Sequence, residues 1–371
     1  MVNYTLSIIL AIFFFLPQVG EWFLYHKQWW LCVFFRSFFV AYLITPIVIK
    51  ISHKFKILDL PDERKMHTQP TPRLGGVAIF FTVLLLTINY FKYSTELTGV
   101  IIATSIIFLV GLYDDIKGFK ASTKLLAQIL ATLILIKFGV MLSFVPHWPG
   151  EHLIEAVITI IWIIGITNAI NFLDGIDGLC AGLGVVCMTL FFIIGWHLRQ
   201  TYLAYLTIAL TGACVGFLPY NYRFLSGKRA SIFLGDSGST VIGFLLASVA
   251  VMGSWAVKDP VVSFSTPLLV LGVPIFDMIY TTISRFKNGS VRTIKEWLEF
   301  VGKDHFHHRL VTLGLLEKHA VMFILLITFC LGLGAIVIRQ LKGFWAIFLL
   351  LQSIIIFFII TILMRLGRQR D

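Results

Sequence analysis

The chain has 371 residues, of which 58% are hydrophobic and 13% are charged, and its mean hydropathy is +0.90. Soluble domains carry about 25% charged residues, so this composition excludes a soluble globular protein and predicts an all-α polytopic membrane protein. A net charge of +11 would also suit nucleic acid. The basic residues, however, gather in loops beside apolar segments, where they suit anionic lipid headgroups and nucleotides. We therefore expect no nucleic-acid partner.

Eleven apolar stretches are long enough to cross a bilayer of about 30 Å. They are Trp30–Ile49, Leu74–Tyr90, Leu97–Tyr113, Leu125–Val145, Leu153–Phe172, Leu179–His197, Tyr202–Pro219, Thr240–Val257, Val262–Ile283, Ala320–Ile338 and Phe344–Met364. A further stretch, Leu6–Leu24, contains Pro17 and Glu21 and is expected to be an interfacial or a twelfth membrane helix. We divide the chain into an N-terminal apolar extension at residues 1–28 and a single transmembrane domain at residues 29–371. Arg36 lies inside an apolar span and is expected to reach the interface or a lipid phosphate.

The basic residues also predict the orientation. If the loop after the first span is cytoplasmic and the spans alternate, most lysines and arginines fall on the cytoplasmic side, as the positive-inside rule requires. The longest loops on that side are Ser52–Arg73, Tyr220–Ser239 and Arg285–Lys318. The active face is therefore expected in the cytoplasm.

Asp114 and Asp115 follow the predicted span Leu97–Tyr113. Carboxylates at membrane depth are costly and are functional candidates by default. Neighbouring residues point about 100° apart on a helix, so one carboxylate is expected to contact a metal or substrate. The other would then hold Lys117, Lys124 or a backbone donor. Taken alone, the pair fits a solvated helix boundary equally well.

Polar side chains recur at intervals of three where the span Leu153–Phe172 ends. They are Asn168, Asn171, Asp174 and Asp177. On a helix this spacing places them along one face, and Gly175 and Gly178 allow the backbone to leave the helix. Such an oxygen-rich stripe suits a hard cation and a nucleotide. The alternative is polar contact between membrane helices, which is frequent for asparagine.

Asp236 lies between Gly235 and Gly238, just before the span Thr240–Val257. A helix N-terminus with free backbone amides tolerates a carboxylate and attracts phosphate. A lone aspartate in this position is more often a helix cap than a metal ligand. If the spans alternate across the bilayer, Asp236 falls on the same membrane face as the other acidic motifs, which favours a functional role.

Two basic loops contain candidate anion ligands. The last long loop contains Asp304, His305, Phe306, His307, His308 and Arg309, and the first contains Arg64, Lys65, His67 and Arg73. Three histidines suggest zinc, but no cysteine is nearby and Arg309 would repel a cation. A pyrophosphate or sugar hydroxyls are therefore the expected ligands of these loops. The chain contains no GxxxxGK[ST] loop, GxGxxG fingerprint or GxSxG elbow.

Taken in order, these motifs resemble the polyprenyl-phosphate N-acetylhexosamine-1-phosphate transferase family. The matching segments are Pro61-Asp62 with His67, Pro72-Arg73-Leu74-Gly75-Gly76, GLYDDIKGF with Lys124, NAINFLDGIDGL, FLGDSGS, PIFD with Arg285, and HFHHRL. The resemblance runs from about Lys50 to Leu316. The DHFHHRL form resembles the bacterial undecaprenyl-phosphate GlcNAc-1-phosphate transferases that start O-antigen, common-antigen and teichoic-acid synthesis. It departs from the muramoyl-pentapeptide branch, which usually has three consecutive histidines followed by an acidic residue.

The resemblance implies a Mg²⁺-dependent exchange, with Mn²⁺ as an alternative ion, in the bacterial cytoplasmic (inner) membrane. UDP-N-acetylhexosamine and undecaprenyl phosphate would give undecaprenyl-pyrophosphoryl-sugar and UMP at the cytoplasmic face. The implied site residues are catalytic Asp114, Asp115 and Asp174; metal-binding Asn171 and Asp236; nucleotide-binding Asp177, Phe233 and Asn168; and phosphate- or sugar-binding Lys124, Arg73, His67, His305, His307, His308 and Arg309. The resemblance does not assign separate roles to Asp114 and Asp115. Membrane lipids are the expected surroundings, and a homodimer is compatible with the sequence.

Several alternatives remain at this level. GlcNAc is the expected sugar, while GalNAc, FucNAc, QuiNAc or MurNAc-pentapeptide would require different loop contacts. An ion-coupled secondary transporter also carries intramembrane carboxylates, but its site should lie near the bilayer midplane between repeated halves, and no repeat is visible. A CDP-alcohol phosphotransferase would show DGxxAR, and Asp174-Gly175 lacks the Ala-Arg continuation.

Overall fold

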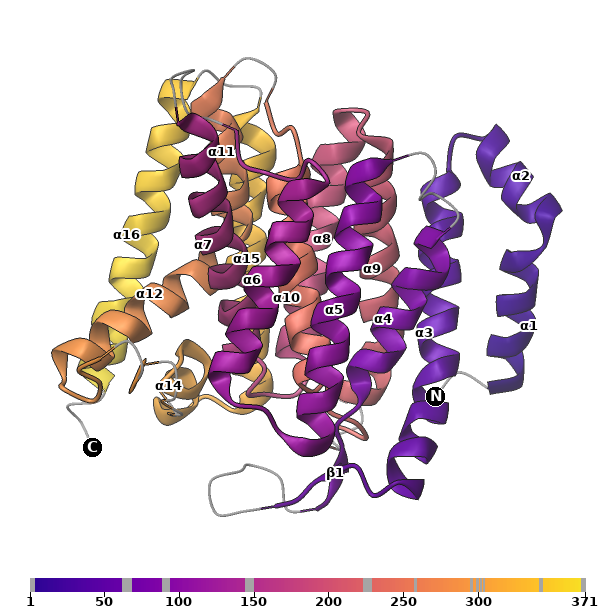
Figure 1. The fold of residues 1–371 in the computed structure, drawn as a ribbon, viewed down its shortest axis with the longest axis horizontal. Helices are drawn as coiled ribbons and strands as arrows, with labels where there is room; N and C mark the ends of the chain where they lie inside the picture. Colours follow the sequence, from indigo (N-terminus) through magenta and orange to yellow (C-terminus); the bar gives the residue numbers. More distant parts are fainter. Residues whose placement is uncertain are drawn as a thin grey trace.

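The computed structural model describes residues 4–61, 69–88, 94–143, 150–222, 229–256, 259–293, 296–297, 300, 302, 304–339 and 343–367. Its helices are α1 (Tyr4–Phe15), α2 (Pro17–Tyr25), α3 (Trp29–Lys54), α4 (Gly75–Thr87), α5 (Thr95–Lys117), α6 (Ala121–Lys137), α7 (Glu151–Phe172), α8 (Leu179–His197), α9 (Thr201–Asn221), α10 (Asp236–Met252), α11 (Pro260–Val270), α12 (Gly272–Lys287), α14 (Phe306–Thr312), α15 (Glu317–Ile338) and α16 (Gly343–Gly367). Two short antiparallel strands, β1 (Leu58–Asp59) and β2 (Thr71–Pro72), pair with Leu58 opposite Pro72. The long helices run side by side as a bundle (Figure 1).

The prediction of an all-α, multi-pass membrane protein is confirmed, but the count of eleven spans is not. Within the described residues, seven helices are long and apolar enough to cross a membrane, or up to nine if each of two bent pairs forms one span. The apolar helices α4 and α10 have 13 and 17 residues, fewer than the about 20 that a span needs. The stretch Val262–Ile283 is broken, with α11 and α12 bent by 75°. Pro274 lacks the N–H that would bond the carbonyl of Val270, which accounts for a break at this point.

The N-terminal stretch is also bent, by 63° between α1 and α2, where Pro17 starts the second helix. Arg36 on α3 donates from Nε to the carbonyl of Phe14 at 2.7 Å, beside this break. Its guanidinium carbon lies 5.4 Å from the centre of the Phe15 ring. Arg36 therefore has a backbone carbonyl and an aromatic ring of the protein beside its guanidinium, while its contact with a lipid phosphate stays a prediction.

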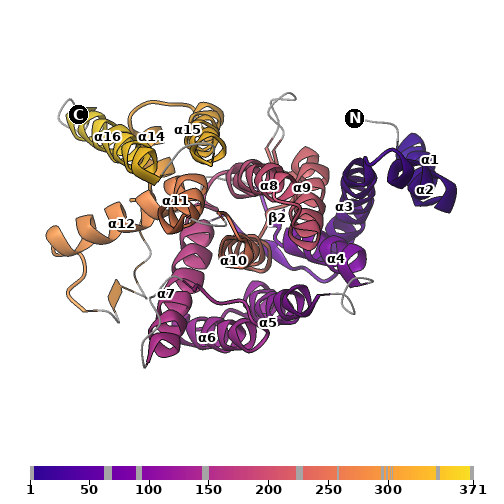
Figure 2. The ribbon, with the colours of Figure 1, turned by 90° about the horizontal axis from the view of Figure 1, so that it is seen from above.

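Helix α10 lies near the middle of the bundle, with α4, α5, α7 and α8 packed around it (Figure 2). Residues Ser237–Val251 are all buried, as expected for a helix that is apolar on every side. Two glycines allow close approach: a Cβ at Gly238 would lie 2.8 Å from Cα of Gly76, and one at Gly243 would lie 2.8 Å from the carbonyl oxygen of Thr167. This packing brings the start of α10 to the ends of α5 and α7.

Candidate active site

The acidic motifs meet at one end of the bundle, which we call the aspartate end and define by Asp114, Asp115, Asn171 and Asp236. Helices α5 and α7 finish there and α10 begins there, at the lower side of Figure 1. The strands β1 and β2 lie at the same end. The fold therefore brings together side chains that are far apart in sequence, and it places them at one end of the bundle rather than at its middle.

Asp115 caps helix α10 from a different helix. Its Oδ1 accepts the backbone N–H of Asp236 at 2.9 Å and its Oδ2 accepts that of Ser237 at 3.0 Å, and the residue is only 4% exposed. A carboxylate satisfies two otherwise unpaired helix amides and interacts favourably with the helix dipole. Gly235 permits this approach, because its φ is 74° and a Cβ there would lie 2.7 Å from Asp115 Oδ2. The sequence suggested Asp236 as the cap; the structure assigns that role to Asp115.

Asp114 and Asp236 share the ammonium group of Lys124. Nζ of Lys124 lies 3.0 Å from Oδ2 of Asp114 and 2.7 Å from Oδ2 of Asp236. The other Asp114 oxygen accepts the backbone N–H of Phe119 at 2.5 Å. Of the two lysines expected near the aspartate pair, Lys124 is thus the partner, while Lys117 lies over the ring of Tyr113.

Arg73 joins the same group from the strand side. Its Nη2 lies 3.6 Å from Oδ1 of Asp115 and donates to the backbone carbonyl of Asp114 at 3.3 Å. Its Nη1 lies 3.6 Å from Asp59 on β1. Two cations, Arg73 and Lys124, therefore face the aspartates, as expected for a site that receives phosphates.

The asparagines of the polar stripe have different partners. Asn171 donates from Nδ2 to Oδ1 of Asp236 at 3.3 Å and to Oγ of Ser239 at 2.8 Å, so it belongs to the aspartate end. Asn168 exchanges amide hydrogen bonds of 2.8 and 3.3 Å with Gln128 on α6 and also donates to the carbonyl of Ile164. Its amide is thus engaged in the contact between α6 and α7. Gln128 was not singled out in the sequence.

The turn after α7 carries the two remaining aspartates. Burial, and then the charges of Asp236, Asp115 and Asp177, hold the pKa of Asp174 well above its ordinary value. Asp177 accepts the backbone N–H of Ala230 at 2.9 Å, which ties this turn to the segment before Phe233. The backbone of Phe233 donates to the carbonyl of Pro72 at 2.7 Å.

Asn221, which the sequence did not single out, anchors the same region. Its Oδ1 accepts the N–H of Gly178 at 2.9 Å and its Nδ2 donates to the carbonyl of Ile232 at 3.0 Å. Gly178 has a φ of 80°, and a Cβ there would collide with Tyr222. An amide between two backbone segments gives no sequence pattern of its own, so only the fold reveals it.

The segment Asp304–Arg309, which we call the histidine loop, packs against the turn after α7. His307 is fully buried, and a Cβ at Gly175 would lie 2.3 Å from its Nε2. The ring centres of His307 and His308 are 4.1 Å apart. Arg309 donates to the carbonyl of Asp304 at 2.5 Å and lies 4.8 Å from the ring of Tyr280. His67, the remaining predicted ligand, lies outside the described residues.

The side chains at the aspartate end fit Mg²⁺ bound together with phosphate. Mg²⁺ in proteins is usually held by one or two carboxylates, with water and substrate phosphates completing its shell. Among the described residues no group of three or more His, Cys, Asp or Glu side chains is arranged to hold an ion, so Asp236 and Asn171 would supply only part of the shell. The pKa of Asp174 is raised first by burial and then by the neighbouring carboxylates, and a cation would relieve the second of these effects.

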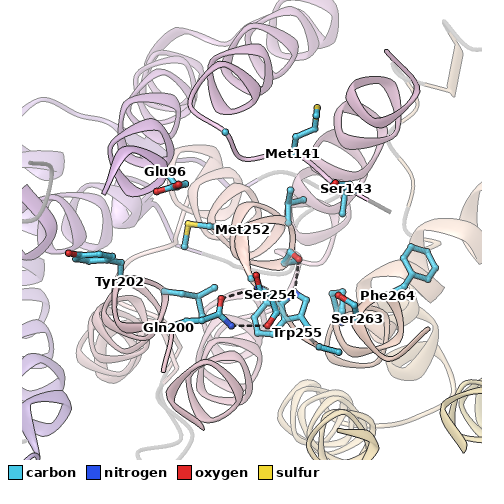
Figure 3. Close-up of a pocket in the computed structure, with 18 of the residues that line it drawn as sticks. Glu96, Met141, Ser143, Gln200, Tyr202, Met252, Ser254, Trp255, Ser263 and Phe264 are labelled. Atoms are coloured by element: carbon cyan, nitrogen blue, oxygen red, sulfur yellow. Dashed lines mark hydrogen bonds between the residues drawn. The ribbon is translucent and has the colours of Figure 1, made fainter. Parts of the chain in front are cut away.

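A cavity of ≈ 810 Å³ lies at the opposite end of the bundle, which we call the cavity end. Its lining includes Glu96 near the start of α5, Gln200 and Tyr202 around the start of α9, and Ser254 just after α10 (Figure 3). Helix α10 has 17 residues and separates it from the aspartate end by about 25 Å. None of the predicted site residues lines this cavity.

Comparison with known proteins identifies the family. A model of glycosyl transferase family 4 matches residues 97–254. A probable undecaprenyl-phosphate N-acetylglucosaminyl 1-phosphate transferase of Bacillus subtilis is 32% identical over 334 residues, covering 88% of this chain and 90% of the relative. A decaprenyl-phosphate N-acetylglucosaminephosphotransferase of Mycolicibacterium smegmatis is 31% identical, over 80% of this chain and 79% of its own length.

An undecaprenyl-phosphate alpha-N-acetylglucosaminyl 1-phosphate transferase of Escherichia coli is 27% identical over 75% of both chains. The prediction of a phosphotransferase is thereby confirmed, and the transporter and CDP-alcohol phosphotransferase alternatives give way to it. The chain belongs to glycosyl transferase family 4, the polyprenyl-phosphate N-acetylhexosamine-1-phosphate transferases that its motifs predict.

Proposed function

We propose that the protein transfers GlcNAc-1-phosphate from UDP-GlcNAc to undecaprenyl phosphate, releasing UMP and starting a cell-envelope polysaccharide. The observation that carries this proposal is the meeting of Asp114, Asp115 and Asp236 with Lys124 and Arg73 at one end of a membrane bundle. The named relatives, which are all polyprenyl-phosphate N-acetylglucosamine phosphotransferases, support the lipid acceptor and the sugar.

In this proposal Asn171 and Asp236 hold Mg²⁺, with Mn²⁺ as a substitute. The ion would neutralise the pyrophosphate of the donor and the departing UMP. Lys124 already contacts Asp236, so its ammonium lies where it could contact the same pyrophosphate. Arg73 would contact the phosphates from the strand side.

The acceptor needs little activation. A phosphate monoester has a second pKa of about 6 and is largely dianionic at pH 7, so no strong base is required. A phosphate oxygen of the acceptor attacks the β-phosphorus in line, a new P–O bond forms, and the bond from the β-phosphorus to the bridging oxygen of UMP breaks. Asp115 fixes the start of α10 and thereby Asp236, while Asp114 orients Lys124. The positive charge of a bound ion would favour the ionised form of Asp174.

The nucleotide and the sugar are assigned to the surrounding segments. Asp177 and Phe233 are the proposed contacts of the uracil, and the loop containing His307, His308 and Arg309 is the proposed contact of the sugar. The basic loops support a position of this end on the cytoplasmic face of the bacterial inner membrane, where UDP-sugars and UMP are soluble. GalNAc, FucNAc and QuiNAc remain the donors to compare with GlcNAc.

The test is transfer by purified protein in lipid nanodiscs. Radiolabelled UDP-GlcNAc, undecaprenyl phosphate and Mg²⁺ should give a labelled lipid together with UMP, and EDTA should abolish both products. The same reaction with UDP-GalNAc measures the sugar preference. Absence of lipid product from every UDP-N-acetylsugar, with folded protein and active lipid, would refute the proposal.

A further inference from the structure

Helix α12 carries a buried polar stripe whose purpose the proposed reaction does not explain. Asp277, Thr281 and Arg285 are spaced four residues apart, so they lie on one face, and they are 0%, 2% and 3% exposed. Other faces of α12 expose apolar side chains such as Ile279 and Ile283. A buried carboxylate and a buried guanidinium are costly unless they have specific partners.

Both charged residues of the stripe bind the histidine loop. Asp277 Oδ2 accepts Nδ1–H of His305 at 2.8 Å, and Asp277 Oδ1 accepts the backbone N–H of Phe306 at 2.6 Å. Arg285 binds Asp304 through two hydrogen bonds of 2.7 Å. Burial acts to raise the pKa of Asp304, but the hydrogen bonds and charge of Arg285 outweigh it, and this pKa lies below its ordinary value.

This arrangement occupies both ring nitrogens of His305. Nη2 of Arg285 lies 3.1 Å from Nε2 of His305 and can only donate, so Nε2 carries no proton. The proton on Nδ1 points to Asp277, which defines a neutral tautomer assigned from the hydrogen-bond network. His305 is therefore part of the support of the loop and has no ring nitrogen left for a ligand.

His307 is in the opposite situation. It is fully buried, its ring stacks parallel to that of His305 at 6.2 Å, and neither of its nitrogens has a hydrogen-bond partner in the described structure. Buried polar atoms are nearly always paired, so two orphaned nitrogens beside Gly175 indicate a ligand group. Burial holds the pKa of His307 well below its usual value. A neutral imidazole suits a hydroxyl or an amide better than an anion.

We propose that Asp277 is a positioning residue that fixes His305 and the first turn of α14, so that His307 faces the Asp174–Gly178 turn and receives an uncharged polar group of the donor sugar. The inference rests on the proposed function for the identity of the donor. It assigns separate tasks to the two histidines, since His305 supports the loop and His307 binds the ligand. It also makes α12 a determinant of sugar binding through its contacts with the loop.

The test compares binding of UDP with binding of UDP-GlcNAc by the full-length protein in nanodiscs. Asp277→Asn keeps the size of the side chain but turns an amide donor toward His305 or Phe306. It should weaken UDP-GlcNAc binding by about tenfold, the equivalent of one charge-assisted hydrogen bond, while the Kd for UDP changes less than about twofold. In the transfer reaction KM should rise and kcat should change little.

A matched pair at position 305 keeps the test independent of folding defects at Asp277. The side-chain amide of Asn can replace Nδ1–H and reach Asp277, whereas the longer side chain of Gln places its amide at the position of Nε2 and leaves Asp277 without its donor. His305→Asn should therefore lose UDP-GlcNAc affinity by less than about threefold and His305→Gln by about tenfold or more. Ile279→Ala on the exposed face of α12 serves as the control.

Equal weakening of UDP and UDP-GlcNAc by Asp277→Asn, or equal behaviour of the two His305 variants, would overturn the positioning role. Wild-type protein that binds neither nucleotide would overturn the proposed function as well. The two failures are thus distinguished by the wild-type protein. A selective loss of the sugar nucleotide in Asp277→Asn and His305→Gln is the expected result.

Discussion

Two carboxylates cap helices at opposite ends of the bundle, and they do so in different ways. Asp259 at the cavity end caps its own helix, accepting the N–H groups of Val261 and Val262 at 3.0 and 3.2 Å. Asp115 at the aspartate end caps α10 from α5, across 121 and 122 residues of sequence. A local cap stabilises one helix. A cap from another helix also fixes the distance between two helices.

The difference between the two ends locates the chemistry. The cavity at the cavity end has a volume of ≈ 810 Å³. On its lining two neutral groups, the side chain of Gln200 and the backbone of Ser254, exchange two hydrogen bonds of 2.9 and 3.0 Å. The aspartate end has its charges held against one another, with Lys124 between two carboxylates. Convergence of charged groups from several elements is therefore a better guide to this site than the size of a cavity.

The largest expected effect tests the two caps directly. Asp115→Asn leaves one backbone N–H of α10 facing an amide donor, so the free energy of unfolding should fall by about 2 kcal/mol and transfer by about 100-fold. Asp259→Asn keeps a good capping residue and should leave transfer within about twofold of wild type. Thermal unfolding and initial rates measure both. Similar losses in the two variants would remove the distinction between the ends.

Lys124→Met tests the ion pairs of the aspartate end, which contrast with the neutral hydrogen bonds between Gln200 and Ser254 at the cavity end. Asp114 and Asp236 would lose their shared counter-charge, and because the side chains of Lys124 and Asp236 are partly exposed, the destabilisation should be about 1 kcal/mol. Mg²⁺ should then raise the Tm of this variant more than that of wild type, although transfer falls by at least about tenfold. A Mg²⁺-dependent shift equal to that of wild type would argue against a cation site beside Asp236.

Variants of the α6–α7 contact test whether Asn168 has a structural role or binds the nucleotide. Asn168→Leu and Gln128→Leu should each cost about 1 kcal/mol, whereas the double variant should cost less than their sum because no buried amide is left unpaired. The KM for UDP-GlcNAc should change less than about twofold. A tenfold rise in KM would restore the nucleotide role that the sequence suggested for Asn168.

The smallest effect is expected at the cavity end. Gln200→Ala removes two hydrogen bonds in a solvent-accessible position, so stability should fall by about 0.5–1 kcal/mol and transfer should remain within about twofold. Denaturation and rate measurements in the same nanodiscs check this. A large loss of transfer would show that the cavity end communicates with the reaction.

The sequence supports prediction where the controlling interactions are local or compositional. Helical spans follow from apolar stretches, and the order of Asp115, Asn171 and Asp236 along alternating spans predicts that they meet at one end. The break at Leu271, between α11 and α12, was missed because the apolar pattern continues through it. The count of eleven spans is not confirmed among the described residues, since hydropathy does not reveal that α4, α6 and α10 have only 13, 17 and 17 residues.

Pairings between distant segments could not be predicted. Nothing near Asp115 in the sequence indicates that its carboxylate oxygens accept hydrogen bonds from the start of α10. Nothing near Gln128 indicates Asn168 as its partner. The loop histidines look alike in sequence, yet His305 has two protein partners and His307 none among the described residues. Such roles depend on which backbone and side-chain groups the tertiary packing brings within about 3 Å.

The central claim, that the chemistry belongs to the aspartate end, is tested most directly by matched substitutions in the transfer assay. Asp236→Asn and Glu96→Gln each replace one carboxylate with its amide, near the start of α10 and near the start of α5, respectively. Transfer of labelled GlcNAc-1-phosphate to undecaprenyl phosphate should fall by at least about 100-fold in the first and by less than about twofold in the second. Comparable activity of the two variants, or loss confined to Glu96→Gln, would contradict the account.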